Sequence, residues 1–503
     1  MQRIEDLDGG VDGERGRGPP TPALPRKGGG GRVPATSVLF CHVSTSGDEL
    51  RRKPTTRCGD GRPAASLPAM TYAPISDRSA PPAVYARAAP DAPSSPPLDG
   101  PRRAEVAVIG AGFTGLSAAL HLAEAGAEVT VLEAKEIGWG ASGRAFGQVV
   151  PYLKISEAAI LRRYGADRGA TVIDAVASGP DLVFGLIERH RIECWPVRTG
   201  LIFAAHAPAG RRALERRAAF WQQRNAPVEL LDAGQCAELI GSPVYQAATI
   251  DRRGGHINPF AYVRGLARAA AAAGAIIYAH TPVDGISRAN GSWHVRTQRG
   301  EVTADCVVVA TNAYTTALWP GLRESVVPVR SYGFVSAPLS DNLRHSILPG
   351  RQSLSDTRRL VSAVRMLPDG RLHASARGPL GGPERPTDWR LVDDRVKRLF
   401  PQLDRTPWEE SWTGFIAMTA DHVPRLHELA PGMFAGLGYN GRGIAAATMM
   451  GRDLARLARG ATETAFPRVA LQPLPLAPLL PVIARGVAGY YRARDWLDQV
   501  ILS

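Results

Sequence analysis

Cysteine and lysine are both scarce in this chain. The five cysteines are widely separated and form no Cys-x-x-Cys pair; they are Cys41, Cys58, Cys194, Cys236 and Cys306. Disulfide frameworks and zinc sites need paired or closely spaced cysteines, so neither is expected and no metal site is predicted. Only five of the 60 basic residues are lysines, which leaves few lysines for any catalytic role.

The sequence also lacks a long uninterrupted apolar run. Apolar residues gather between Leu471 and Tyr491, but several prolines and Arg485 interrupt them. This stretch is too broken to span a bilayer, and we expect a short helix packed on the body of the protein. Nothing near the start resembles a secretory signal. The sequence therefore predicts a cytoplasmic protein without stable membrane insertion.

Acidic residues are fewer than basic ones, and the net charge is +13. Nucleic-acid-binding proteins usually concentrate such an excess on one face or in one run. Here Lys and Arg are spread along the chain, so we expect no nucleic-acid partner. A dispersed positive charge is compatible with an anionic cofactor or substrate.

Residues 1–103 lack apolar periodicity and are rich in Pro and Gly. That composition predicts a disordered leader. Acidic residues near the start argue against a transit peptide. Met70 is an alternative start, in which case the first 69 residues would be mistranslated upstream sequence.

Regular structure is expected from Glu105 onward. Glu105–Ile109 reads as a buried strand, Leu116–Ala125 has helical apolar spacing, and Val129–Leu132 reads as the next strand. The turn between the first strand and the helix fits Gly-x-Gly-x-x-Gly, with glycines at 110, 112 and 115. Glu133 closes the second strand, where its carboxylate can accept hydrogen bonds from a ribose. Strand, turn, helix, strand and acid in this order predict a dinucleotide site.

Two further glycine-rich loops follow. The loop 138–144 (GWGASGR) suits close passage under a long cofactor such as FAD, whereas an NAD site would not need it. The loop 436–443 (GLGYNGRG) is also formally Gly-x-Gly-x-x-Gly after a strand. It could form a second dinucleotide site for NAD(P)H. It fits better as a helix N-terminus that stabilises negative charge on a reduced flavin, because no strand ending in an acid follows its helix.

The remaining chain alternates twice between α/β and antiparallel character. Helices dominate 156–253, Asn258–Ala273 is a helix, and a hairpin at 292–304 precedes a strand at 306–310. Alternating segments at 326–337 and 360–376 predict antiparallel strands. The fold class is therefore α/β (α+β overall), a Rossmann-like FAD domain with a discontinuous antiparallel substrate domain. The expected boundaries are 104–155, 254–325 and 405–465 for the FAD domain, 156–253 and 326–404 for the substrate domain, and 466–503 for a C-terminal tail and helix.

Together these motifs resemble the D-amino-acid-oxidase-like superfamily of FAD-dependent oxidoreductases, most closely proteins of the gamma-glutamylputrescine oxidase type. The likeness runs from about Glu105 to Gly460 and includes GGHINP (254–259), DTRRL (356–360) and Trp412-Thr413-Gly414. It implies FAD and a small amine substrate, with O₂ or an electron carrier as acceptor. The cofactor-binding residues expected are Gly110, Gly112, Phe113, Thr114, Gly115, Glu133, Ala134, Gly140, Ala141, Ser142, Arg144, Gln148, Val283, Thr311, Gly438, Asn440, Gly441, Arg442, Gly443 and Ile444.

The chain departs from the family pattern at three positions. The loop after GASGR usually continues Asn-Gly-Gly-Gln, whereas here Phe146 replaces a glycine and narrows the site. Sarcosine oxidases attach FAD to a cysteine near the position of Gly414, and no cysteine follows Cys306, so non-covalent FAD is expected. Those enzymes hold the substrate carboxylate with a lysine where this chain has Ala445, which disfavours a sarcosine-like substrate.

The catalytic residues are less clearly marked, because flavin chemistry needs no dedicated base. Reaction with O₂ benefits from a nearby cation, often a lysine in related oxidases. The only lysine in the substrate-sheet region is Lys397, on a charged helix-like stretch. Arg365 and His373, on strand-like segments, are predicted in its place, although solvated strand residues would look the same. Tyr439 flanks the last glycine turn and is the third catalytic prediction.

The resemblance therefore implies oxidation of an amine or amino-acid-like substrate to an imine, which hydrolyses to an aldehyde or keto acid. With O₂ as acceptor, the second product is H₂O₂. One alternative is a dehydrogenase that passes electrons to a quinone or carrier. Another is a flavin-binding protein without turnover.

Overall fold

The computed structural model describes residues 82–358, 362–377, 386–403, 406–475, 486, 489 and 490. All of them belong to one compact unit, 68–503. The predicted alternative start and most of the predicted disordered leader lie outside these residues. So does most of the predicted C-terminal helix.

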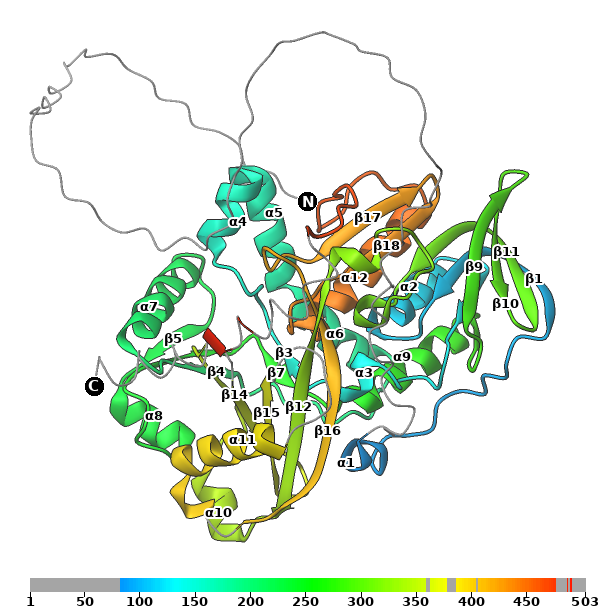
Figure 1. The fold of residues 1–503 in the computed structure, drawn as a ribbon. Coiled ribbons are helices and arrows are strands. Elements are labelled where there is room, and N and C mark those ends of the chain that lie inside the picture. Colours follow the sequence, from blue (N-terminus) through cyan, green and yellow to red (C-terminus); the bar gives the residue numbers. More distant parts are fainter. Residues whose placement is uncertain are drawn as a thin grey trace, which may run out of the picture. The chain divides into compact units, whose positions relative to one another are not determined.

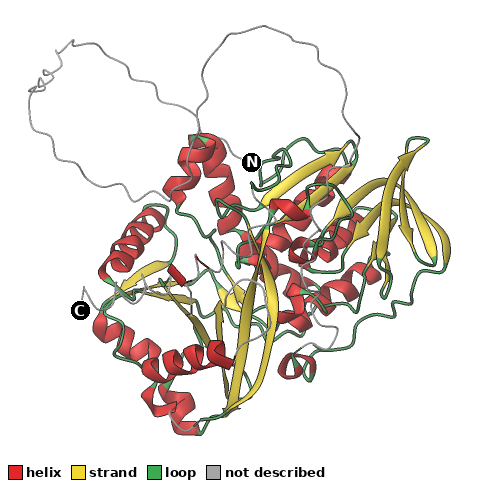
Figure 2. Cartoon of the chain, in the orientation of Figure 1, coloured by secondary structure: helices red, strands yellow, loops and turns green. Residues whose placement is uncertain are grey.

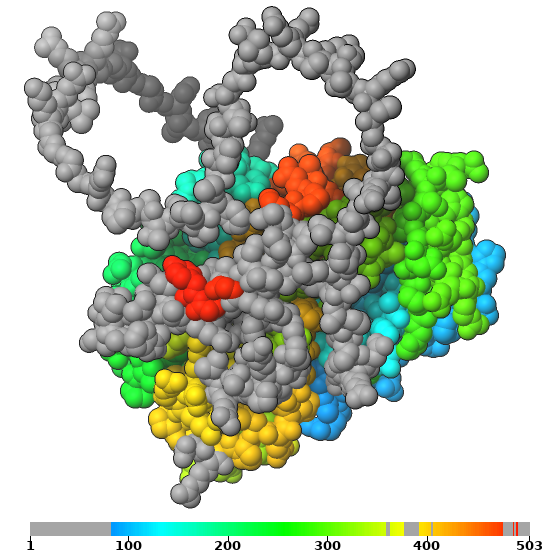
Figure 3. Space-filling view, viewed as in Figure 1, coloured from blue at the N-terminus to red at the C-terminus, as the bar shows by residue number. Residues whose placement is uncertain are grey.

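A mainly parallel sheet carries the glycine-rich turn. Its core strands are β1 (Gly100–Ile109), β2 (Val129–Leu132), β8 (Ile276–Tyr278), β11 (Gly300–Val309), β17 (Arg425–Ala430) and β18 (Met433–Leu437). They run in the order β17-β18-β11-β1-β2-β8. The hairpin strands β9 (Val283–Ala289) and β10 (Ser292–Thr297) extend β11 and form an outer edge beside the start of β1 (Figure 3). We call this the nucleotide sheet, because β1 leads directly into the Gly110 turn.

Three helices pack on the nucleotide sheet, namely α2 (Phe113–Glu124), α9 (Pro259–Ala272) and α12 (Gly443–Ala458). Helices α2 and α12 lie side by side (Figure 1), and the Ser117 hydroxyl donates to the Thr448 carbonyl oxygen at 2.7 Å. A side chain at Gly451 would collide with the backbone of α2, so glycine permits this close approach. Helix α9 starts where the sequence predicts, because Asn258 caps it by accepting from two backbone N–H groups.

A second, mostly antiparallel sheet forms the other half of the molecule. Its strands are β4 (Leu201–Ala204), β5 (Val228–Leu231), β6 (Ala248–Asp251), β12 (Val327–Pro338), β13 (Ser353–Asp356), β14 (Ser362–Met366), β15 (Arg371–Arg377) and β16 (Trp408–Met418). The order is β16-β12-β15-β14-β13-β4-β6-β5, with the long strands β12 and β16 side by side (Figure 2). We call this the substrate sheet. A parallel and an antiparallel sheet in one chain confirm the predicted fold class.

The remaining elements connect and cover the two sheets. They are α3 (Ala141–Arg144), β3 (Gln148–Val149), α4 (Glu157–Tyr164), α5 (Ala166–Ala177), α6 (Gly179–Arg189), α7 (Pro208–Gln222), α8 (Ala233–Ile240), β7 (Gly255–His256), η1 (Asn312–Tyr314), η2 (Arg323–Ser325), α10 (Asp341–Ser346), α11 (Pro386–Leu399) and η3 (Pro401–Leu403). The stretch 166–189 is long and apolar enough to cross a membrane by composition. However, it is divided into α5 and α6, and residues such as Val172, Ile173 and Val183 lie in the largest core cluster.

The structure corrects the predicted start of order. Within the expected leader, α1 (Ala83–Ala86) is helical, Tyr85 and Leu98 are buried, and β1 begins at Gly100. The backbone N–H of Val84 donates to the Glu410 carboxylate on β16. Single apolar anchors in an extended segment produce no periodicity, so the sequence pattern could not show that this segment packs.

One further boundary differs from the prediction. Strand β16, expected in the FAD domain because it follows residue 405, pairs with β12 along its whole length and belongs to the substrate sheet. Within 156–253, expected in the substrate domain, the strands β4, β5 and β6 lie between the helices and join the substrate sheet. These strands are only four residues long, too short to show an alternating pattern.

Candidate active site

A cavity of about 450 Å³ lies between the nucleotide sheet and the substrate sheet. Its nucleotide half is formed by the turn after β1, the end of β2, the loop 138–148 and the start of α12. Its substrate half is formed by residues of β12, β13, β14, β15 and β16. The two halves are continuous.

The first glycine turn has the geometry that a dinucleotide needs. Gly110 has φ +102°, and a Cβ there would lie 3.1 Å from the Ala310 carbonyl oxygen. A Cβ on Gly115 would collide with the Gly110 carbonyl oxygen, so the third glycine brings α2 directly onto the turn. Gly112, Phe113 and Thr114 at the start of α2 line the cavity, at the place where a dinucleotide fold binds a pyrophosphate.

Glu133 stands at the end of β2 and lines the same half. Its carboxylate accepts from the backbone N–H of Ala111 at 2.7 Å and of Lys135 at 3.0 Å. Desolvation raises the pKa of Glu133, and these N–H donors act in the opposite direction. An acid oriented by the turn itself is placed to accept the hydroxyls of a ribose.

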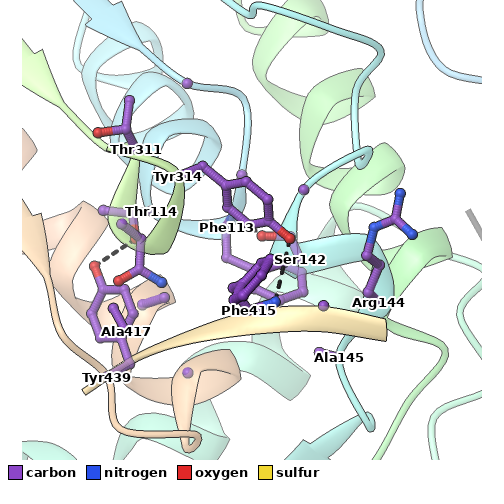
Figure 4. Close-up of a pocket in the computed structure, with 18 of the residues that line it drawn as sticks. Phe113, Thr114, Ser142, Arg144, Ala145, Thr311, Tyr314, Phe415, Ala417 and Tyr439 are labelled. Atoms are coloured by element: carbon purple, nitrogen blue, oxygen red, sulfur yellow. Dashed lines mark hydrogen bonds between the residues drawn. The ribbon is translucent and has the colours of Figure 1, made fainter. Parts of the chain in front are cut away.

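The loop 138–144 closes over the turn. The Ser142 hydroxyl accepts from the Phe113 N–H at 3.0 Å, and a Cβ on Gly112 would approach that hydroxyl to 2.9 Å. Arg144 is buried, and its Nε donates to the Trp139 carbonyl oxygen at 2.8 Å. Figure 4 shows Ser142 and Arg144 on this loop, with Arg144 to one side.

The N-terminus of α12 forms another wall. The Tyr439 hydroxyl and the Thr114 hydroxyl are 2.6 Å apart and face each other (Figure 4). Asn440 has φ +56°, and its amide group bonds both Thr419 and the Gly438 carbonyl oxygen. The last glycine loop is thus a rigid turn that directs the N-terminus of a 16-residue helix at the cavity.

Most of the predicted cofactor-binding residues line this cavity, namely Gly110, Gly112, Phe113, Thr114, Glu133, Ala134, Gly140, Ala141, Ser142, Arg144, Gln148, Val283, Thr311, Asn440, Gly441, Gly443 and Ile444. Three do not. Gly115 packs α2 on the turn, and Gly438 has φ +80° beside Thr419. The Arg442 guanidinium instead bonds the carbonyl oxygens of Tyr152 and Leu153.

The substrate half is lined by small neutral groups. Ser331, Ser355 and Ser375 present hydroxyls, and Gln148 donates to the Ser355 hydroxyl at 3.0 Å. Phe415 and Ile416 of β16 lie opposite, with the Phe415 N–H bonded to the Tyr314 hydroxyl at 3.4 Å (Figure 4). Among the described residues, the five strands contribute no Asp, Glu, Lys, Arg or His to the lining, and Arg144 of the loop 138–144 lies beside Gly414 of β16. Sequence patterns did not identify these residues, because they come from separate strands.

Tyr439 lines the cavity, but the other two predicted catalytic residues do not. Arg365 and His373 are fully buried rather than solvated, and they lie behind Phe146. Lys397, the lysine that they replace in the prediction, pairs with Asp393 at 3.0 Å on α11.

The Arg365 guanidinium donates to four neutral acceptors. Its Nε bonds His373 Nδ1 at 3.3 Å, and its Nη2 bonds the Tyr85 hydroxyl at 2.8 Å. Its Nη1 bonds His256 Nδ1 at 3.1 Å and the Ile257 carbonyl oxygen at 2.8 Å. No described carboxylate pairs with Arg365. Tyr85 was missed by sequence reasoning because it lies in the expected leader.

These contacts determine the state of both histidines. A guanidinium offers only donors, so both Nδ1 atoms accept and each ring is neutral with its proton on Nε2. His256 Nε2 then donates to the Arg351 carbonyl oxygen at 2.9 Å. The Nε2 of His373 is buried and has no partner among the described residues. Burial and the Arg365 charge lower both pKa values, that of His256 to about 3.

The residues present fit a dinucleotide with a bulky second half. The glycine turn and Glu133 accommodate an adenosine diphosphate, and the cavity continues to the N-terminus of α12 and the substrate sheet. Within the described ranges, no group of three or more His, Cys, Asp or Glu side chains is arranged to hold a metal ion.

The family comparison decides between the dinucleotides. A family model described as FAD dependent oxidoreductase matches residues 105–457. The chain belongs to this family. It therefore is an FAD-dependent oxidoreductase, and the resemblance and the predicted cofactor are confirmed.

Individual relatives agree with this assignment. The gamma-glutamylputrescine oxidoreductase of Escherichia coli (strain K12) is 34% identical over 400 residues, which cover 78% of this chain and 93% of that protein. A probable oxidoreductase, OrdL, of Haemophilus influenzae is 31% identical over 383 residues, 73% of this chain and 86% of the relative. The crystal structure of glycine oxidase from Geobacillus kaustophilus matches with a TM-score of 0.62 and 26% identity, over 73% of this chain and 97% of that one.

Proposed function

We propose that this FAD-dependent oxidoreductase oxidises an amine whose reacting carbon carries no carboxylate. The observation that carries the proposal is the neutral, hydroxyl-lined substrate half of the cavity, which is continuous with the nucleotide half. A carboxylate beside the reacting nitrogen would need a cationic partner, and the described residues of the five strands supply none to the lining. The name of one relative, gamma-glutamylputrescine oxidoreductase, supports an amine substrate.

The flavin and the lining residues have different roles in this reaction. Bound flavin supplies the hydride acceptor, so the protein has to orient the amine and exclude water. The hydroxyls of Ser331, Ser355 and Ser375 can orient neutral polar groups of the substrate, and Phe415 and Ile416 cover its apolar part. The product imine hydrolyses to an aldehyde and ammonia. Cys194, Cys236 and Cys306 lie outside the cavity lining, which supports non-covalent FAD.

We propose O₂ as the electron acceptor, with H₂O₂ as product. Arg365 supports this choice, since a buried cation without a described carboxylate partner favours negative charge developing nearby in a low-dielectric site. It would act from behind Phe146 as an electrostatic element, without touching the reacting atoms.

The test is an anaerobic titration of the purified yellow protein with polyamines, gamma-glutamyl amines, N-methyl amines and α-amino acids, following the visible flavin band. Bleaching by the amines but not by the α-amino acids would support the proposal. Preferential bleaching by α-amino acids would overturn it. Admitting air then distinguishes the acceptors, because rapid return of the colour with formation of H₂O₂ indicates an oxidase. Slow return in air but fast return with a quinone indicates a dehydrogenase.

A further inference from the structure

Phe146 separates two very different environments. The residue lines the cavity, yet its ring also packs against His373, with centroids 4.6 Å apart. The Arg365 Cζ atom lies 5.4 Å from the centroid of the same ring. Phe146 is thus a thin apolar wall between the neutral substrate half and a buried cation.

The cation behind this wall lacks a negative partner. The guanidinium of Arg365 is 1% exposed, and its acceptors are two imidazole nitrogens, a phenol and a backbone carbonyl. A buried charge is normally paired with an opposite charge. In addition, the Nε2–H of His373 is a buried donor without a partner among the described residues. A cation and an unused donor next to each other are the requirements of a carboxylate site.

The backbone next to Phe146 is held independently of its side chain. Gly147 has φ +101°, and a Cβ there would lie 2.7 Å from both Cζ and Nη2 of Arg365. The Gly147 carbonyl oxygen accepts from the Ile257 N–H at 2.9 Å, and the Tyr85 hydroxyl lies 3.2 Å from the Ala145 carbonyl oxygen. The loop therefore rests directly on the guanidinium, and shortening Phe146 would remove the wall while the loop stays in place.

We propose that Phe146 is a specificity-determining residue that shields a latent carboxylate-binding subsite formed by Arg365 and His373. With the ring in place, a carboxylate in the cavity meets an apolar surface, and substrates with a carboxylate near the amine are excluded. Without the ring, the same carboxylate would meet the guanidinium and the free Nε2–H. This inference rests on the proposed function for its meaning in catalysis, but the carboxylate site can be measured without turnover.

The experiment uses the FAD-loaded protein and acetate as the probe. Acetate binding is followed as a change in the visible flavin spectrum, in the wild type and in Phe146→Ala. The variant should bind acetate ~10-fold or more tightly than the wild type, the range for hydrogen bonds to charged groups. In Phe146→Ala/Arg365→Met the gain should be lost. An acetate affinity of Phe146→Ala equal to that of the wild type, or a gain that persists without Arg365, would overturn the proposal.

Two matched variants control for the space that truncation creates. Phe146→Leu keeps an apolar cover and should show no gain, and Ile416→Ala enlarges the same cavity away from Arg365 and should also show none. A gain in either would contradict the proposal. If Arg365→Met fails to retain flavin, His373→Phe in the Phe146→Ala background removes the free Nε2–H, and it should lower the acetate affinity. An unchanged affinity there would count against the subsite.

The spectral readout also separates the two proposals. If no amine bleaches the flavin but Phe146→Ala binds acetate, the proposed function fails and the shielded subsite stands. If amines bleach the wild type and acetate binding is unaffected by Phe146, the opposite holds. A gain of α-amino-acid oxidation by Phe146→Ala, lost again on replacing Arg365, would support both.

Discussion

The two halves of the cavity are built in opposite ways. The nucleotide half is formed largely by backbone, and its central turn, helix and acid come from one short run, 110–133. The substrate half is formed by side chains from five strands, spread over residues 331–417 of the sequence. The nucleotide half depends on glycines that permit close approach. The substrate half depends on the buried residues behind its lining, above all the cluster of Arg365, Tyr85, His256 and His373.

The largest expected effect concerns the backbone of the nucleotide half. Gly112→Val would push a side chain into the Ser142 hydroxyl, which also accepts from the Phe113 N–H. FAD should be lost, with an affinity at least ~100-fold weaker, because two or more backbone contacts to the pyrophosphate fail together. Flavin absorbance after gel filtration measures this. Gly185→Ala, at a position with open space around it, should stay yellow. Yellow Gly112→Val protein would show that the pyrophosphate lies elsewhere.

The two buried histidines behind the substrate half should make the free energy of unfolding depend on pH. His256 and His373 have pKa values far below the ~6.5 of an unfolded chain, so between pH 6.5 and about 3 the unfolded state binds more protons. Stability is therefore complete above about pH 7 and falls as the pH decreases, by about 2 kcal/mol between pH 7 and 5 for His256, with a further loss in the same direction for His373.

Urea unfolding at both pH values measures this loss, and His256→Gln or His373→Gln should each remove the contribution of the replaced ring. His345→Gln, on exposed α10, should leave it unchanged. A stability equal at pH 5 and 7 would mean that the two rings are not held neutral.

A smaller effect is expected at the acid of the nucleotide half. Glu133→Gln keeps the shape but weakens the bonds from the Ala111 and Lys135 N–H groups and to the ribose. FAD affinity should fall ~10-fold, as expected for loss of one or two charge-assisted hydrogen bonds. Titration of apoprotein with FAD tests this, and exposed Glu136→Gln serves as the control. Equal affinities would place the ribose away from Glu133.

Removing the Tyr85 hydroxyl, which lies behind the substrate half, should lower the free energy of unfolding by a small amount. Tyr85→Phe leaves Arg365 Nη2 without its acceptor at 2.8 Å, which should lower the free energy of unfolding by about 1–2 kcal/mol. Urea unfolding checks this against Tyr164→Phe, whose hydroxyl accepts only from Arg163 on the surface. An unchanged free energy of unfolding in Tyr85→Phe would show that the segment before β1 does not stabilise the site through this hydroxyl.

The smallest expected effect is on the lining of the substrate half. Ser375→Ala removes the hydroxyl of one of the three serines in the lining, so KM should rise ~3-fold with little change in kcat, the effect of one neutral hydrogen bond. Steady-state kinetics with the best amine of the panel measures it. Ser340→Ala, exposed at the start of α10, is the control. A kcat loss without a KM change would assign Ser375 a role in the reaction itself.

Some parts of the site could be predicted from the sequence because they depend on residues that are close together in the chain. Gly110, Gly112 and Glu133 were identifiable because their turn, helix and strand are consecutive, and the chemistry follows from local backbone geometry. The same holds for Asn258, whose cap starts α9. Arg365 and His373 were predicted as catalytic residues in place of a lysine, but their burial was not foreseen, since a charged residue on an alternating strand normally faces water.

The sequence by itself determined the first glycine turn and its acid, because these depend on contacts within about 30 consecutive residues and on glycine's backbone freedom, and the order of the motifs along the chain indicated the family and the cofactor. Only the tertiary structure decided that β16 joins the substrate sheet, that the segment before β1 packs through Tyr85, and that Phe146 covers Arg365. Each of these depends on contacts between residues 60 or more positions apart, where side-chain volume and charge have to match across elements. A local sequence pattern does not show whether the side chains of distant elements match in this way.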